Sequence, residues 1–198
     1  MKKGFWKRLV DKLFVDKYNC IICDEELEEP TKYGICPTCM DKMPINDGSS
    51  ICLKCGKHMR DEAKYCITCQ RETFLFDMNR SAFIYKDSVR KLILNLKYAS
   101  KKYLAKYLAE SYVDLYKKYD YNSDLVTAVP ISEGRMKERG FNQAEEIAKV
   151  VAERLGLPYI SNVVVKTKDL VAQEQLRGKD RIVSVLGAFE LIKNTTSI

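Results

Sequence analysis

The chain has 198 residues, of which 46% are apolar and 31% are charged, and its formal net charge is +7. This length suits one ordinary domain with a hydrophobic core and a smaller second one. No segment approaches the ~18 uninterrupted apolar residues of a membrane span, and charged residues interrupt the N-terminal segment where a secretory signal peptide would be apolar. We therefore expect a soluble protein of the reducing cytoplasm.

Residues 1–17 are expected to form a short amphipathic helix. Its apolar residues follow the helical repeat on one face, with basic residues elsewhere. They are Phe5, Trp6, Leu9, Val10, Leu13 and Phe14. Such a stripe usually docks on a neighbouring domain or partner. Peripheral association with the inner face of the membrane is the less favoured alternative.

All eight cysteines lie in four CxxC pairs, which are Cys20/Cys23, Cys36/Cys39, Cys52/Cys55 and Cys66/Cys69. Two thiolates on one tight turn hold one side of a tetrahedral ion, and a second pair ~10 to 20 residues later completes the site. Four thiolates leave no open coordination position. The pattern therefore predicts two structural zinc ions in a double zinc ribbon over residues 18–72.

Other uses of these cysteines fit the sequence less well. A redox CxxC would need a strand–helix context, and iron–sulfur motifs pack three cysteines closely. Neighbouring pairs in two consecutive ribbons are favoured over an interleaved arrangement, because residues 44–50 have the composition of a linker. Two such sites would lower the formal charge of +7 to about +3.

From Thr73 onward the pattern predicts a second domain, residues 73–198, with alternating helices and strands. A short strand over 81–85 precedes a helix that buries Val89, Leu92, Ile93, Leu96 and Tyr98. The remaining elements are a helix over 102–118, a buried parallel strand over 125–129, a polar loop to Gly140, a helix from Asn142 to Leu155 and a strand over 159–165. Strand, helix and strand in this order predict a parallel α/β unit.

Basic residues are concentrated between residues 80 and 119, a segment that contains ten Lys or Arg and three acidic residues. Such a run is more often a solvated helix face than a binding site, yet it suits a phosphate-rich partner. The candidate nucleic-acid-binding residues are Arg90, Lys91, Lys97, Lys101 and Lys102.

The loop after Val129 is a second candidate site, because ligands of open α/β sheets bind beyond the carboxyl ends of the strands. Arg135, Lys137 and Arg139 supply cations ahead of a helix N-terminus, which suits phosphate or pyrophosphate.

One motif is specific. Val129-Pro130, then Arg135, then the hexapeptide 139–144 (RGFNQA) resemble the signature of the ComF family, competence-associated proteins with a phosphoribosyltransferase-like domain. Segments on either side of the signature also match. The likeness extends over essentially the whole chain, including a short apolar helix and a double zinc ribbon.

The resemblance implies a twisted parallel sheet of the type I phosphoribosyltransferase fold. It implies a role in natural transformation, handling single-stranded DNA with a helicase of the uptake machinery. The loop after Pro130 would correspond to the pyrophosphate loop, and residues 166–181 to the basic loop that closes on substrate, adding Arg177 and Arg181 to the phosphate-facing cations. In that loop Asn142 and Gln143 would either contact the phosphate or cap their helix.

The resemblance also has a gap. The family's segment for phosphoribosyl pyrophosphate, an apolar strand ending in two aspartates and then Thr-Thr-Gly-Ala-Thr, does not follow Phe189. The sheet is therefore expected to be incomplete, and no catalytic residue is assigned. A phosphoribosyltransferase using Mg²⁺ in a full-length form, and a zinc-ribbon adaptor that docks a partner protein, are the alternatives to a competence role.

Overall fold

The computed structural model describes residues 18–60, 63–99, 101–168, 176 and 179–192. The chain divides into two compact units after Met43, an N-terminal unit to that residue and a C-terminal unit from Pro44. The predicted helix over 1–17 lies outside the described residues. Among the described helices, none is both long enough and apolar enough to cross a membrane.

The N-terminal unit is built around the first two cysteine pairs. Strands β1 (Tyr18–Asn19) and β2 (Glu26–Leu27) pair antiparallel on either side of the first pair. Helix α2 (Pro37–Asp41) begins at the second pair, where Cys36 is the extended N-cap residue. Proline suits this first helical position, because its missing N–H has no partner within the helix.

The C-terminal unit begins with a second ribbon of the same design. An antiparallel bridge joins Ile51 to His58 on either side of the third cysteine pair. Helix α3 (Ile67–Arg71) follows with Cys66 as its N-cap residue. The sequence repeats the ribbon as a structural unit, although the two copies belong to different compact units.

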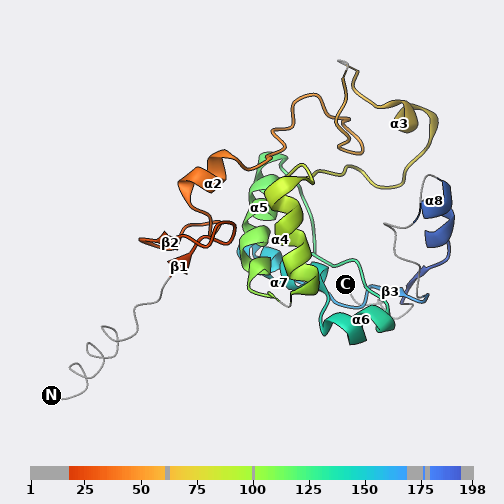
Figure 1. Ribbon diagram of the computed structural model, residues 1–198. Coiled ribbons are helices and arrows are strands. Elements are labelled where there is room, and N and C mark those ends of the chain that lie inside the picture. Colours follow the sequence, from red (N-terminus) through yellow and green to blue (C-terminus); the bar gives the residue numbers. More distant parts are fainter. Residues whose placement is uncertain (1–17, 61–62, 100, 169–175, 177–178, 193–198) are drawn as a thin grey trace. The chain divides into compact units, whose positions relative to one another are not determined.

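Three helices form the body of the C-terminal unit (Figure 1). They are α4 (Asp87–Tyr98), α5 (Leu104–Lys118) and α7 (Gln143–Leu155). On α4 the predicted apolar face is buried at Val89, Leu92 and Leu96. Tyr98 departs from the prediction, because its side chain is half-exposed at the end of the helix.

The core lies between α5 and α7. Ala109 is fully buried there, and it forms a cluster with Val113 and Val151. Arg154 at the end of α7 reaches back to the buried carboxylate of Glu110 on α5, with 3.0 Å between its Nε and Oε1. A small residue at position 109 allows the two helices to approach closely.

Enlarging that small residue should destabilise the C-terminal unit. Ala109→Leu adds three carbon atoms to a position with no exposed surface, so we expect a cost of about 1–3 kcal/mol. Lys106→Leu, at an exposed position one turn earlier on α5, is the matched control. Urea unfolding followed by circular dichroism checks this, and equal stabilities of the two variants would contradict tight packing at Ala109.

The predicted parallel sheet is not confirmed. β3 (Val164–Lys166) and β4 (Phe189–Leu191) pair antiparallel, and the short helix α8 (Lys179–Val185) lies between them in the chain. The described residues show one parallel contact, an isolated bridge between Val126 and Tyr159. The expectation of a buried strand over 125–129 is wrong, because these residues are half-buried or exposed. A strand is buried by neighbours on both sides, and the bridge supplies one.

Two other predicted elements differ from the structure. The strand over 81–85 is reduced to one antiparallel bridge between Ile45 and Phe83. The polar loop before Gly140 contains a helix, α6 (Glu133–Arg139). Its sequence explains why it forms, since Ser132 accepts the N–H of Arg135 as an N-cap and Gly140 ends the helix with a positive φ of 74°.

Candidate functional site

The first metal centre gathers Cys20, Cys23, Cys36 and Cys39, whose four Sγ atoms lie within 4.8 Å of one another. The turn that presents the first pair is closed by the N–H of Asp24, which donates to the carbonyl of Cys20 at 2.8 Å. Asp24 has a positive φ of 66°, so the chain reverses immediately after the pair. This places both thiols of the turn on the same side.

The second centre gathers Cys52, Cys55, Cys66 and Cys69 within the same distance limit. The N–H of Gly56 donates to the carbonyl of Cys52 at 2.9 Å, in the position that Asp24 occupies in the first ribbon. Consecutive cysteine pairs therefore share a site, as the sequence predicted, and the interleaved alternative is excluded.

The thiols in each centre differ in acidity. Burial raises the pKa of Cys20, but backbone N–H groups of its own turn and of Cys36 outweigh burial and lower it to about 6. The pKa of Cys52 is lowered to about 6 in the same way. Burial and neighbouring thiols raise the pKa of Cys39 and of Cys69 to about 12. A divalent ion would displace the protons that these thiols retain.

The second ribbon is tied to the segment that follows it. Asn79 donates its backbone N–H to the carbonyl of Lys54 at 2.8 Å and its amide to the carbonyl of Cys55 at 3.4 Å. Arg80 donates to the carbonyl of Leu53 at 2.9 Å. Three consecutive carbonyls of the metal-binding turn are thus bound by two adjacent residues.

Arg80 extends this connection to the end of α5. Its guanidinium carbon lies 4.7 Å from the ring centroid of Tyr119, the C-cap residue of that helix. Beside it, Lys118 donates to the carbonyl of Asp47 in the segment before the ribbon, at 2.5 Å. The second metal centre therefore belongs to the same compact unit as the helices. The predicted boundaries at residues 17/18 and 72/73 stay predictions.

The predicted nucleic-acid-binding residues lie on α4 and on the connection between α4 and α5. Arg90 and Lys91 are exposed, Lys97 is half-buried and Lys101 is exposed. Lys102 pairs with Glu146 at 3.9 Å, and its ammonium lies 4.6 Å from the ring centroid of Phe141. Lys102 therefore also holds the start of α5 against α7.

The predicted phosphate-binding cations of α6 have different surroundings. Arg135 binds Glu138 at 2.7 Å, and Lys137 is exposed. Arg139 donates to Gln143 Oε1 at 3.0 Å and to the hydroxyl of Tyr98 at 3.3 Å, while its guanidinium stacks on the Tyr98 ring. The structure thus brings Arg139 to α4.

Asn142 and Gln143 are both buried at the start of α7. Asn142 accepts the N–H of Ala144 as an N-cap and donates to the carbonyl of Val129, both at 3.0 Å. Capping therefore occupies Asn142. Arg177 lies outside the described residues, and Arg181 lies in α8, where its side chain is also outside them.

The sequence does not predict the part that three residues play in these sites. The helical position of Tyr98 predicts a core residue, whereas its exposed ring binds Arg139. Asn79 and Arg80 directly follow the ribbon, and no motif marks them. The available signal was Gly56, because a glycine just after a CxxC pair indicates a tight turn with another backbone close to it.

Comparison with known proteins agrees with this architecture. A model of the family described as "Double zinc ribbon domain" matches residues 9–70. With the two four-thiolate centres, this shows that the chain binds two structural zinc ions.

Two curated relatives match beyond the ribbons. Competence protein F of Haemophilus influenzae is 25% identical over 179 residues, covering 88% of this chain and 76% of the relative. Competence protein ComFC of Bacillus subtilis is 24% identical over 152 residues, covering 68% of this chain and 62% of the relative, less than two thirds of its length. No solved structure matches the chain. Its double zinc ribbon and these two relatives together support the resemblance to the ComF family.

Proposed function

We propose that this chain is a ComF-type competence protein that assists the uptake of single-stranded DNA in natural transformation. The observation that carries the proposal is the length of the chain over which the relatives match. A protein named for competence matches 88% of this chain, so the likeness includes the helices as well as the ribbons. The protein would act in the cytoplasm, at the inner face of the membrane, with a helicase of the uptake machinery as its partner.

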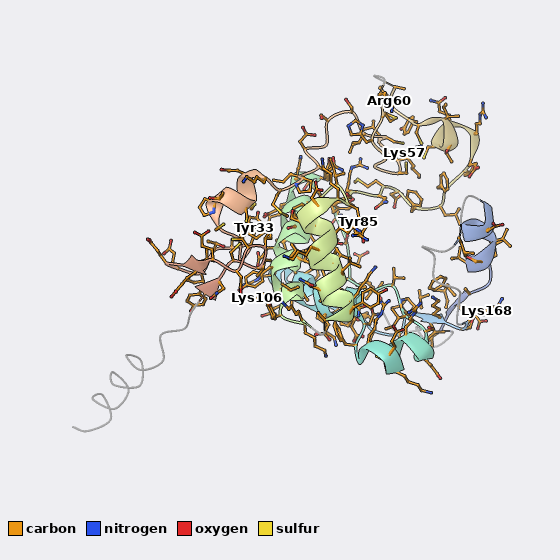
Figure 2. All side chains as sticks on the ribbon, in the orientation of Figure 1. Tyr33, Lys57, Arg60, Tyr85, Lys106 and Lys168 are labelled. Atoms are coloured by element: carbon orange, nitrogen blue, oxygen red, sulfur yellow. The ribbon has the colours of Figure 1, made fainter. Side chains whose placement is uncertain are left out.

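The basic side of α4 is the proposed surface for the DNA backbone. Leu92 and Leu96 face the core, so Arg90 and Lys91 project on the solvent side of the helix, and Lys101 continues the row. Figure 2 shows Tyr85 at the start of the same helix, and its ring is more than half exposed. Cations that track the phosphates and exposed rings that stack on bases are the usual components of a single-strand site.

The finer fold proposal is a phosphoribosyltransferase-like core. The parallel bridge between Val126 and Tyr159, with α7 between them, supports a strand–helix–strand unit of this kind. A phosphoribosyltransferase that uses phosphoribosyl pyrophosphate and Mg²⁺ is the second candidate function. Its supporting observation is Lys137, an exposed cation on α6, the helix that follows the parallel bridge at Val126.

Two variants of equal charge separate a DNA-binding surface from general basicity. Changing Arg90 and Lys91 to Gln removes two cations from α4, whereas changing Lys149 and Lys166 to Gln removes two from elsewhere in the unit. We expect the α4 variant to bind a labelled oligonucleotide more weakly in fluorescence anisotropy. The slope of log K against log salt should become shallower by about 1.4, since each lost phosphate contact of a single strand contributes about 0.7.

The role in competence is tested in the organism that encodes the chain. Deletion of the gene should lower the transformation frequency. A gene copy that encodes the Lys149/Lys166 variant should restore this frequency, whereas a copy that encodes the Arg90/Lys91 variant should not. Unchanged transformation after deletion would refute the competence role. Restoration by both variants would refute the α4 surface.

A further inference from the structure

The second ribbon contains a cavity of about 360 Å³ that none of the roles above uses. It lies beside the second zinc centre. Its walls are formed by Lys54 of the first turn, by Tyr65 ahead of the second turn, by Arg71 at the end of α3, and by Phe74 after that helix. This volume falls in the range of small-ligand sites, about 300–1,000 Å³.

Aromatic rings line and adjoin the cavity. Phe74 lines the wall, and its ring centroid lies 5.4 Å from that of Phe76. The ammonium of Lys54 lies 5.3 Å from the Phe76 ring. Tyr65 is 45% exposed and Phe76 is 41% exposed, so both rings keep open surface. A flat, apolar ligand could stack here, and every nucleobase presents such a face.

The walls are held by the metal-binding fold. Gln70 on α3 donates its amide to the carbonyl of Tyr65 at 2.7 Å. The N–H of Leu53 donates to the carbonyl of Lys64 at 2.9 Å, which joins the two turns of the ribbon. Because the cysteines fix both turns, the backbone that carries Tyr65 is held before any ligand arrives, and less conformational entropy is lost on binding.

Charge decides which part of a nucleotide fits. A zinc ion with four thiolates carries a charge of about −2, and Cys69 of that centre lines the cavity. Lys54 and Arg71 balance this charge, while Glu72 adds a negative one. The cavity therefore suits an uncharged base and disfavours a free phosphate group.

We propose that this cavity binds an unpaired base of single-stranded nucleic acid, by stacking on Tyr65 and Phe74. This inference rests on the proposed function, and it adds a base-stacking site in the second ribbon to the phosphate-binding surface of α4. A strand held at both places would be bound through its bases and its backbone independently.

An oligothymidylate and a strand of the same length with abasic sites carry the same backbone charge, so together they isolate stacking. Tyr65→Ala should weaken binding of the oligothymidylate by about 5- to 150-fold, the range for one lost base–aromatic stack. The same change should leave binding of the abasic strand unaltered. Tyr65→Phe keeps the ring and should bind like the unchanged protein.

Tyr33→Ala is the matched control. Tyr33 lies in the first ribbon with the Lys32 ammonium 5.1 Å from its ring, so it offers a similar cation and aromatic pair outside the cavity. Each full-length variant should contain two zinc ions, which verifies its fold. Equal loss of affinity in Tyr65→Ala and Tyr33→Ala, or no loss in either, overturns the cavity assignment while strand binding itself stands.

Two further results separate this inference from the proposed function. Unchanged protein that binds neither strand at low salt overturns the cavity site together with the α4 surface. A Tyr65→Ala protein that keeps full affinity for the oligothymidylate but fails to restore transformation would assign the cavity to a protein partner, and would overturn base binding.

Discussion

Cys52→Ser should release one zinc ion and unfold the helices of the C-terminal unit, whereas Cys20→Ser should release one zinc ion and leave those helices folded. The difference follows from the compact units, because Cys52 shares a unit with α4, α5 and α7 and Cys20 does not. Structural zinc contributes about 10–16 kcal/mol to small ribbons, against a total stability of about 5–15 kcal/mol for a domain.

The path from that ion to the helices consists of the contacts of Asn79 and Arg80. They bind the carbonyls of Leu53, Lys54 and Cys55, and Arg80 stacks on Tyr119 at the end of α5. Circular dichroism at 222 nm and zinc analysis on the full chain check the prediction. Identical helical signals in the two variants, each with one zinc ion lost, would show that the second ribbon folds independently.

Gly56→Ala should be far more destabilising than Gly140→Ala, although both glycines have nearly the same backbone conformation. The φ angles are 70° and 74°, so alanine at either site costs about 1–2 kcal/mol of left-handed strain. A Cβ at position 140 meets nothing within 4 Å, whereas one at position 56 would lie 2.6 Å from the carbonyl oxygen of Asn79. That oxygen belongs to the backbone and cannot rotate away.

Both variants therefore carry the cost of left-handed strain. Gly56→Ala carries a second cost, because its Cβ would push the ribbon away from Asn79. Each kcal/mol should lower the melting temperature by about 2–4 °C in a chain of this size. Thermal unfolding of the zinc-loaded proteins measures the difference. Equal melting temperatures for the two variants would mean that the close approach of Asn79 to the metal-binding turn does not form.

The zinc centres could be predicted from sequence because their determinants are local. Each CxxC pair contains its own turn, and the spacing between pairs limits which of them can meet. Helices α5 and α7 were also predictable, since apolar residues recur with the helical period on each of them, among them Leu104 and Leu108 on α5 and Val151 on α7. The N-cap role of Asn142 was one of two alternatives left open.

Other features depend on partners far away in the sequence. Leu125–Val129 is apolar enough for a buried strand, yet burial requires neighbours that a local pattern does not specify. Tyr98 continues the apolar face of α4 in register, but Arg139, forty-one residues later, binds its ring and hydroxyl at the surface. The attachment of the second ribbon to the helices could not be predicted either, because its acceptors are backbone carbonyls, which every residue has.

Hydrogen exchange of the α5 amides tests the attachment of the second ribbon to the helices most directly. It should be measured by mass spectrometry on the full-length Cys52→Ser and Cys20→Ser proteins and on the unchanged chain. We predict that residues 104–118 lose their protection in Cys52→Ser and retain it in Cys20→Ser. Full protection of α5 in Cys52→Ser, with the second zinc ion absent, would contradict the account.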